Sequence, residues 1–303
     1  MENSKVPMLR FPGFKGEWEE KKLGELSQLI TKGTTPQKFV KEGIKFIKIE
    51  SFEGDRINPS KCLFIDLTTH EKELKRSRLD EGDILFAIAG ATIGKVNIVL
   101  SEILPANTNQ ALAIVRLNPI SNRNFILQVL KSEIMKRYIQ DNIAVGAQPN
   151  LNLEQMNNFS FAVPTLPEQT KIASFLQAID TRLQALRQKK NLLEQYKQGL
   201  MQKLFSQKIR FKDENGEDFG EWEEKTLKDL ARITTGSSNR VDSNLDGEYT
   251  FFDRSQDIRS SNIYLFDSEA VIVGGEGKEF VPKYFKGKFD LHQRTYAILP
   301  NDK

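Results

Sequence analysis

The chain has 303 residues, enough for two domains with cores of their own, because a domain takes roughly 100–200 residues. Hydrophobic residues make up 39% and charged residues 28%, which excludes a disordered or membrane-embedded chain. The net charge is only +3, and one cysteine with two distant histidines excludes an internal disulfide and a Cys/His zinc cluster. We therefore expect a cytoplasmic protein without zinc, in which any basic surface is local.

The first part of the chain, residues 1–165, is predicted to mix strands and helices. Alternating apolar and polar residues at 40–49 predict a strand, and short apolar runs at 84–89 and 111–115 predict buried strands. Residues 123–140 carry apolar side chains at a helical spacing, which predicts one amphipathic helix. The longest apolar run is far shorter than the roughly 20 residues of a membrane-spanning helix, so no membrane association is expected.

A long connecting helix is predicted over residues 166–208. Pro164 and Pro167 end the preceding strand-like run, and Glu168 in the first turn suits the helix dipole. No proline interrupts residues 168–205, and the apolar residues follow a heptad spacing typical of a coiled coil. The residues expected at this subunit interface are Ile172, Leu176, Ile179, Leu183, Leu186, Leu193, Leu200 and Leu204.

Two lysines bear on what the helix packs against. Lys190 and Lys197 fill the remaining positions of the heptad stripe and would weaken a simple self-dimer. The preferred mate is therefore a different long helix. The alternative is that the helix lies on the surface of its own domain.

The last part of the chain, residues 209–303, repeats the first. Residues 9–33 and 209–236 share Gly-Glu-Trp-Glu-Glu-Lys and flanking matches, and the only tryptophans, Trp18 and Trp222, occupy equivalent places. The two segments are too far apart for a solenoid repeat, so they indicate a duplicated domain. Apolar runs at 270–273 and 295–299 match the buried strands of the first copy. The expected fold class is α+β, with duplicated domains joined by a long heptad helix and the second domain incomplete.

Motifs for catalysis are scarce. Residues 90–95 resemble a phosphate-binding loop, but the glycine spacing is one residue short and Val96 replaces the Ser or Thr that binds magnesium. The Pro-Pro-aromatic signature of adenine methyltransferases and a glycine-rich loop suited to S-adenosylmethionine are both absent from the sequence. We therefore expect a chain that holds no cofactor and is not an enzyme by itself.

Two alternatives remain open. Glu276 and Lys278 follow a predicted strand in the Glu-x-Lys pattern of metal-dependent nucleases, with Asp257 or Asp267 as a third ligand. Such short patterns are common by chance, and the neighbouring glycines favour a turn. The second alternative is a protein-interaction scaffold in which the long helix is the active surface.

Polar loops near equivalent strand ends in both copies are the best candidates for binding. Asn and Gln can make paired hydrogen bonds to adenine, whereas Lys and Arg suit guanine or phosphate. The candidate DNA-binding residues of the first copy are Lys32, Thr34, Thr35, Gln37, Lys38, Asn107, Asn109, Gln110, Gln148 and Asn150. Those of the second copy are Ser237, Asn239, Arg240, Gln293 and Arg294.

Taken together, these residues resemble a specificity subunit of a bacterial type I restriction-modification system. The resemblance covers essentially the whole chain and rests on the paired openings at Trp18 and Trp222 and on Lys-Gly-Thr-Thr-Pro at 32–36. It also rests on Gly-Ala-Gln-Pro-Asn-Leu at 146–151 and on Pro-x-Leu-Pro-Glu-Gln at 164–169 before the long helix. The combination is specific, although none of its parts is specific alone.

The resemblance implies two target-recognition domains that each read half of a split double-stranded DNA sequence, held apart by a pair of antiparallel helices. It implies two methyltransferase subunits that bring S-adenosylmethionine, and a motor and nuclease subunit that uses ATP and magnesium. The chain itself would be non-catalytic and would direct adenine methylation and DNA cleavage by these partners. The mate of the long helix would follow the second domain, and the sequence stops at Lys303 before it.

Overall fold

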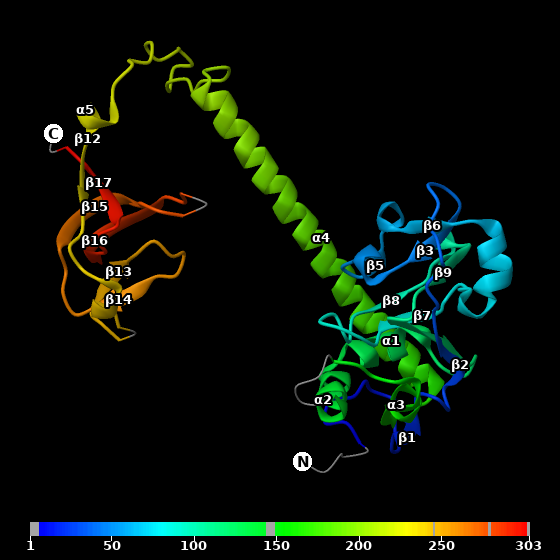
Figure 1. The fold of residues 1–303 in the computed structure, drawn as a ribbon. Coiled ribbons are helices and arrows are strands. Elements are labelled where there is room, and N and C mark those ends of the chain that lie inside the picture. Colours follow the sequence, from blue (N-terminus) through cyan, green and yellow to red (C-terminus); the bar gives the residue numbers. More distant parts are fainter. Residues whose placement is uncertain (1–5, 144–148, 245, 278–279, 302–303) are drawn as a thin grey trace. The chain divides into compact units, whose positions relative to one another are not determined.

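Two compact units make up the computed structural model, Met1–Gln202 and Lys203–Lys303. The described residues are 6–143, 149–244, 246–277 and 280–301. Both units contain strands and helices, which confirms the mixed fold class (Figure 1). Most of the long helix belongs to the first unit.

The centre of the first unit is a four-stranded antiparallel sheet. In spatial order its strands are β2 (Ser27–Lys32), β10 (Leu112–Leu117), β7 (Ile84–Ala87) and β8 (Val96–Ile98). Every residue of β7 is buried, because the sheet is covered on both faces. Ile84 and Phe86 belong to the core on one face, and Leu85 and Ala87 to the core on the other.

Helices cover one face of this sheet. They are α1 (Arg123–Lys131), α2 (Glu133–Asn142), α3 (Leu153–Asn158) and the beginning of α4 (Leu166–Phe205). Phe125, Met135, Met156 and Ala173, one from each helix, pack in the same core as Phe86 of β7. The first two turns of the long helix are therefore part of the first unit's core.

A second layer of strands covers the other face. It is the three-stranded sheet β6 (Leu63–Ile65), β3 (Ile44–Ile47) and β9 (Ala106–Thr108), in which β3 and β9 run parallel. Ile47, Cys62 and Ala106 pack there against Leu85 and Ala87 of β7. The remaining strands form two short antiparallel pairs, β1 (Glu19–Lys22) with β11 (Ser160–Val163) and β4 (Phe52–Glu53) with β5 (Arg56–Ile57).

Two predicted elements differ from the structure. The single helix predicted over 123–140 is wrong, because Ser132 adopts an extended backbone and its hydroxyl caps α2 by accepting from the Ile134 amide. The strand predicted over 40–49 is shortened to β3, because Gly43 has a φ of +149° where the chain turns into the strand.

The long helix α4 spans 40 residues, close to the predicted 168–205 (Figure 1). Ile172 packs partly against the core of its own unit, and its predicted place at an interface with a second helix stays a prediction. Further along the helix Ile179, Leu183, Leu186 and Leu193 are exposed, with Leu183 at 45% and Leu193 at 55%, whereas Leu176, Leu200 and Leu204 are half-buried. No helix within the described part of the chain is both long enough and apolar enough to cross a membrane.

A six-stranded sheet forms most of the second unit. Its strands in spatial order are β12 (Ala231–Thr235), β17 (Thr295–Pro300), β15 (Phe266–Gly274), β16 (Lys283–Leu291), β13 (Tyr249–Phe252) and β14 (Arg259–Ser261). The short helix α5 (Leu227–Leu230) precedes β12. Strands β15 and β17 contain the two predicted apolar runs, and Phe252, Phe289 and Leu291 lie in the core.

The strand pairing repeats between the two units. The antiparallel order β2-β10-β7 in the first unit corresponds to β12-β17-β15 in the second. The parallel pair β3 and β9 places Ile47 opposite Thr108, and the parallel pair β13 and β16 places Phe252 opposite Leu291. The duplication seen in the opening sequences therefore extends through the sheets.

Candidate nucleic-acid interface

Each unit contains a close approach between two polar loops. We call the contact of residues 33–38 with 108–111 the first crossing, and that of 236–240 with 291–294 the second crossing. In the first, the Thr34 amide donates to the Thr108 carbonyl at 3.1 Å, and a Cβ on Gly33 would lie 2.0 Å from that oxygen. Only glycine fits such a position without displacing backbone.

The second crossing has the same construction. The Ser238 amide donates to the Leu291 carbonyl at 3.3 Å, and the Gln293 amide donates back to the Ser238 carbonyl at 3.0 Å. A Cβ on Gly236 would lie 1.7 Å from the Leu291 oxygen, so glycine is again required. The two sheets thus present equivalent pairs of loops at equivalent strand ends.

A cleft of about 490 Å³ lies beside the first crossing. It brings together three of the predicted residues, Lys32, Gln110 and Asn150, above the apolar side chains of Ile88 and Leu151. Among the described residues that line it, none carries a carboxylate. A polar cleft without negative charge is suited to a nucleic acid, whose phosphates repel carboxylates.

Hydrogen bonds hold the loops of the cleft in place. The Thr35 hydroxyl donates to the Gln110 side-chain oxygen, which joins the two halves of the first crossing. Thr34 accepts from Arg76 at 3.4 Å, and Asn109 accepts from the Ala111 amide at 3.2 Å. The two other predicted residues of this loop, Gln37 and Lys38, are exposed.

Two of the DNA-binding residues predicted in the first copy are not assigned to this interface. Asn107 is fully buried, with its amide nitrogen donating to the Leu74 carbonyl at 2.9 Å and the Ser77 hydroxyl at 3.1 Å. The prediction that Asn107 contacts DNA is wrong, because pairing of β9 with β3 turns this side chain inward. Gln148 lies outside the described residues.

All five residues predicted in the second unit lie in the second crossing. Gln293 donates to the Asn239 side-chain oxygen at 2.7 Å. Arg240 lies 3.6 Å from the Asp253 carboxylate, and Arg294 lies 3.2 Å from Glu276. Ser237 is exposed beside them. A second cleft, of about 260 Å³, is lined by Arg240, Asp253, Arg254, Ser255 and His292.

The charge of Asp253 is fixed by its surroundings. Partial burial alone would raise the pKa of this carboxyl, but hydrogen bonds from Ser255 and the charges of Arg240 and Arg259 outweigh it and lower the pKa below its usual value. Asp253 is therefore ionised at neutral pH. It holds the guanidinium of Arg240 at the edge of the second cleft.

The geometry gives the nuclease alternative no support. Glu276 is paired with the guanidinium groups of both Arg254 and Arg294, so its charge is already neutralised. Within the described ranges, no three His, Cys, Asp or Glu side chains lie close enough to hold a metal ion. Lys278, the second residue of the pattern, lies outside the described residues.

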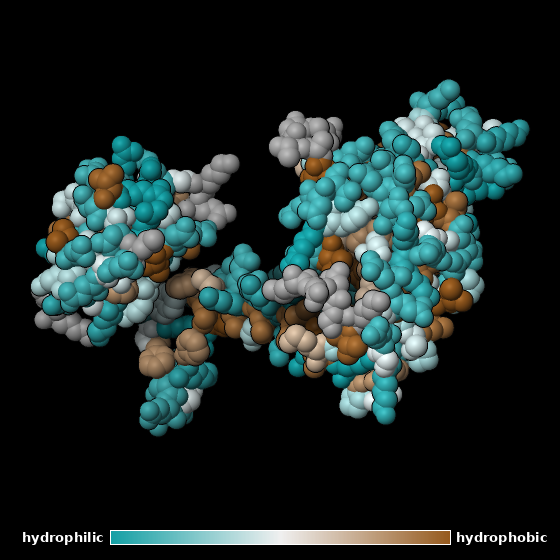
Figure 2. All heavy atoms as spheres, turned by 90° about the horizontal axis from the view of Figure 1, so that it is seen from below, coloured by the Kyte–Doolittle hydropathy of each residue, from teal (hydrophilic) through white to brown (hydrophobic). Residues whose placement is uncertain are grey.

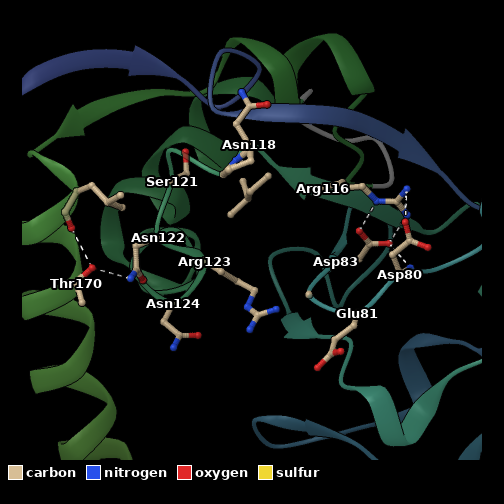
Figure 3. Close-up of a pocket in the computed structure, with 14 residues that line it drawn as sticks. Asp80, Glu81, Asp83, Arg116, Asn118, Ser121, Asn122, Arg123, Asn124 and Thr170 are labelled. Atoms are coloured by element: carbon tan, nitrogen blue, oxygen red, sulfur yellow. Dashed lines mark hydrogen bonds and ion pairs between the residues drawn. The ribbon is translucent and has the colours of Figure 1, made fainter.

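A third concave surface, of about 610 Å³, has the opposite electrostatic character (Figure 3). Its lining includes three carboxylates, and in Figure 3 the Arg116 guanidinium faces two of them, Asp80 and Asp83. Arg116 lies 2.6 Å from Asp80 and 2.8 Å from Asp83. The hydrogen bond with Asp83 raises the pKa of Arg116, which keeps its charge committed to this pair. Asp83 precedes β7, so this pocket lies at the opposite end of the strand from the first crossing. Its carboxylates make it a poor surface for DNA.

Two arginines of the interface were not predicted from the sequence. Arg76 reaches Thr34 of the first crossing, and Arg254 lines the second cleft. The basic run at 72–78 was a signal for Arg76. The sequence around Arg254 gives no comparable signal, because its place depends on its pairing with Glu276, 22 residues away.

The long helix is fixed to the first unit by polar contacts as well as by its buried turns. The Asn122 backbone amide donates to the Gln169 side-chain oxygen at 2.9 Å, and the Asn122 side chain donates to the Thr170 hydroxyl at 3.1 Å. About three turns further along α4, Gln128 of α1 donates to Asp180 at 2.8 Å. These bonds extend the contact beyond the apolar core and set the direction in which α4 leaves the first unit.

The fold and the two crossings place polar loops at equivalent ends of duplicated sheets, and these loops form the candidate surface. Residues 15–195 match the family described as the type I restriction modification DNA specificity domain, and the chain belongs to this family. Its membership confirms the resemblance seen in the sequence.

Individual relatives agree with the family. The chain is 35% identical over 80 residues to the type I restriction enzyme EcoDI specificity subunit of Escherichia coli, which is 26% of this chain and 18% of that protein. It is 28% identical over 221 residues to the putative type I restriction enzyme MjaX specificity subunit of Methanocaldococcus jannaschii, which is 68% of this chain and 51% of that one. The chain therefore spans about half the length of the Methanocaldococcus relative, and less of the other.

The fold also matches a solved structure. The S subunit of the type I restriction-modification system of M. genitalium superposes with a TM-score of 0.59 at 15% identity, over 99% of this chain and 76% of that chain. At this identity the likeness establishes the arrangement of the fold: duplicated α+β domains joined by a long helix.

Proposed function

We propose that the chain is a non-catalytic DNA-binding subunit whose two units each read one half of a bipartite target. The observation that carries this proposal is the repeated crossing. Gln110 lies two residues after Thr108, which pairs with β3, and Gln293 lies two residues after Leu291, which pairs with β13. Both are exposed. Two amides at equivalent places on separate sheets suit two separate half-sites, since a glutamine can bind adenine through paired hydrogen bonds.

The electrostatics support a reading surface that shares phosphate binding with other subunits. A net charge of +3 is small for a protein that clamps DNA alone. The cleft at the first crossing nevertheless combines Lys32 with amides and no carboxylate among its described lining. Base contacts would come from this chain and much of the phosphate contact from its partners.

The partners in this proposal are two modification subunits and one restriction subunit. The modification subunits would bring S-adenosylmethionine and methylate adenine, and the restriction subunit would use ATP and magnesium to cleave DNA. Family membership supports this, and so does the sequence, in which methyltransferase motifs are absent. The exposed stripe of α4 offers a surface on which a subunit or a second helix can pack.

A DNA library selection on the purified complex with its modification subunits tests the proposal. Wild-type protein should enrich a motif of two short parts separated by a fixed gap. Gln110→Ala should relax one position of one part by about 1–3 kcal/mol, because a paired contact to the base is lost. Gln140→Ala, the same change at an exposed position of α2, should select the wild-type motif. No enriched motif, or an unchanged one with Gln110→Ala, would contradict the proposal.

The scaffold alternative rests on the same α4 stripe, with the duplicated domains as spacers. It predicts that the chain binds its partner subunits without DNA and that the complex shows no preference among DNA sequences. Measured partner binding together with an unselective library result would favour it.

A further inference from the structure

A basic segment of the first unit lies beside the first crossing. It consists of the helical turns Thr69–Glu73 and Lys75–Ser77, and within it the side chain of Arg76 donates to the Thr34 hydroxyl at 3.4 Å. Thr34 belongs to one loop of the crossing, and the other loop contains Gln110. Arg76 and Gln110 therefore reach the same crossing from two separate segments of the chain.

Buried contacts fix the backbone on both sides of Arg76. The side-chain amide of Asn107 donates to the Leu74 carbonyl at 2.9 Å and to the Ser77 hydroxyl at 3.1 Å. Leu74 is buried in a small core with Phe46, and Ser77 is fully buried. Because its backbone is held in place, the arginine is presented at the crossing with little freedom to lose when a ligand binds.

The guanidinium of Arg76 is not committed to another charge. Its one partner among the described residues is the Thr34 hydroxyl, and no described carboxylate forms an ion pair with it. Glu71 and Glu73 are exposed on the neighbouring turn without pairing with it. A guanidinium has five N–H donors in a planar fork, so most of them are left for a ligand.

The arginines of the second crossing and its cleft are in a different state. Arg240 lies 3.6 Å from the Asp253 carboxylate, and Arg254 and Arg294 both pair with Glu276. A carboxylate that already holds a guanidinium competes with a ligand for its donors. The exposed and uncommitted arginine is therefore a feature of the first crossing.

The surrounding surface favours a polar ligand. In Figure 2 hydrophilic residues cover most of the visible face of the first unit, and the hydrophobic residues there lie in separate patches. Lys72 and Lys75 are exposed on the same turns as Arg76 and suit phosphates as point charges. A fixed guanidinium suits the O6 and N7 acceptors of guanine, which accept two parallel hydrogen bonds in the major groove.

We propose that Arg76 reads a guanine in the half-site bound by the first unit, beside the base bound by Gln110. This inference rests on the proposed function and names one base of the target. The Thr35 hydroxyl donates to the Gln110 side-chain oxygen and holds that amide at the crossing. A fixed amide and a fixed guanidinium at one crossing suit two neighbouring bases, whereas a phosphate would need neither the fork nor its fixed direction.

A DNA library selection with the modification subunits present tests the inference. The wild-type motif should contain a G·C pair in the part that Gln110→Ala relaxes. Arg76→Ala should lower the preference for guanine at that position at least about fivefold and leave the other positions unchanged, because a paired contact to one base is lost. Arg76→Lys should keep the affinity for non-target DNA but lower the same preference, since lysine retains the charge without the planar fork.

Arg56→Ala is the matched control. Arg56 lies at an exposed position of β5 in the same unit, and none of the described carboxylates forms an ion pair with it. Its removal takes away the same side chain and the same charge outside the crossing. Both the motif and the affinity should therefore stay as in the wild type.

Three outcomes would overturn the inference while the proposed function stands. One is a selected motif without a G·C pair in the part that Gln110→Ala relaxes, and another is a guanine preference that Arg76→Ala leaves intact. The third is an Arg76→Ala loss that is equal for all sequences, which would assign Arg76 to a phosphate. If the wild-type complex selects no motif at all, the proposed function fails and this inference fails with it.

Discussion

The two crossings share their backbone construction but differ in what lies beneath them. Asn107 and Asp290 occupy equivalent positions, opposite Phe46 and Phe251 in the parallel strand pairs, and both are fully buried. Asn107 uses its amide group fully, because its oxygen also pairs with the His70 ring at 2.5 Å. In Asp290 one oxygen accepts from Ser238 and Leu291, but the other has no partner in the described structure.

The difference shows which part of the crossing is fixed and which can vary. The first crossing is tied through Asn107 to the helical turns Thr69–Glu73 and Lys75–Ser77, which precede β7. The second unit connects β14 to β15 by four residues and has no such turns to hold. A close contact at a glycine is thus common to both units. The buried polar residue beneath it, Asn107 or Asp290, has different partners, because only the first unit has helical turns between the equivalent strands.

The largest loss of stability is expected when a methyl group is added at the close glycine contact. Gly33→Ala should destabilise the first unit by about 4 kcal/mol, because the new methyl group meets the backbone oxygen of Thr108. Gly236→Ala should destabilise the second unit to a similar degree. Chemical denaturation followed by tryptophan fluorescence should show each change in one transition only. In the control Gly199→Ala the new methyl meets open space on α4, so stability should rise by up to about 1 kcal/mol.

The next largest difference in stability is expected between the two repeated segments, residues 9–33 and 209–236. Arg10→Ala should cost about 3 kcal/mol, because it leaves the Glu168 carboxylate buried without its partner. Arg210→Ala should change the free energy of unfolding by less than about 0.5 kcal/mol, since no described carboxylate depends on it. Thermal unfolding of the two variants measures the contrast, and equal losses would mean that the openings are not different.

The buried anchors should differ by a smaller amount. Asn107→Ala should cost about 2 kcal/mol, because the Leu74 carbonyl and the Ser77 hydroxyl lose a buried partner. Asp290→Asn should stabilise the second unit by about 1 kcal/mol, because a neutral amide replaces a carboxylate with one unpaired buried oxygen. Urea titrations give both values. A destabilising Asp290→Asn would show that the carboxylate has a partner that the present contacts do not include.

The smallest effect is expected from the charge at the cleft. Lys32→Ala should weaken DNA binding about equally for all sequences and lower the salt dependence of the affinity by about one unit of slope, since Lys32 would meet phosphate rather than a base. Binding titrations at several salt concentrations measure this. A sequence-selective loss would instead place Lys32 among the base contacts.

Much of this arrangement follows from local sequence patterns. The buried strands, the long helix and the polar loops at equivalent strand ends were predicted, because each is encoded by residues close together in the chain. The break at Ser132 was missed, since a single capping serine inside a continuous apolar pattern gives a weak signal. Asn107 was predicted to lie on the surface, but it is buried because β9 pairs with β3. That pairing joins residues far apart in the chain: Thr108 donates to the Ile47 carbonyl, 61 residues away. Glu168 was predicted only as a dipole partner, since Arg10 lies 158 residues away.

Methylome sequencing tests the central claim, that the two crossings read separate halves of one target. The host would express the chain with its matched modification subunits, as wild type, Gln110→Ala or Gln293→Ala. We expect a new methylated-adenine motif of two short parts with a fixed gap, in which each variant relaxes a different part. No new mark with a soluble complex present, or two variants that relax the same part, would contradict the account.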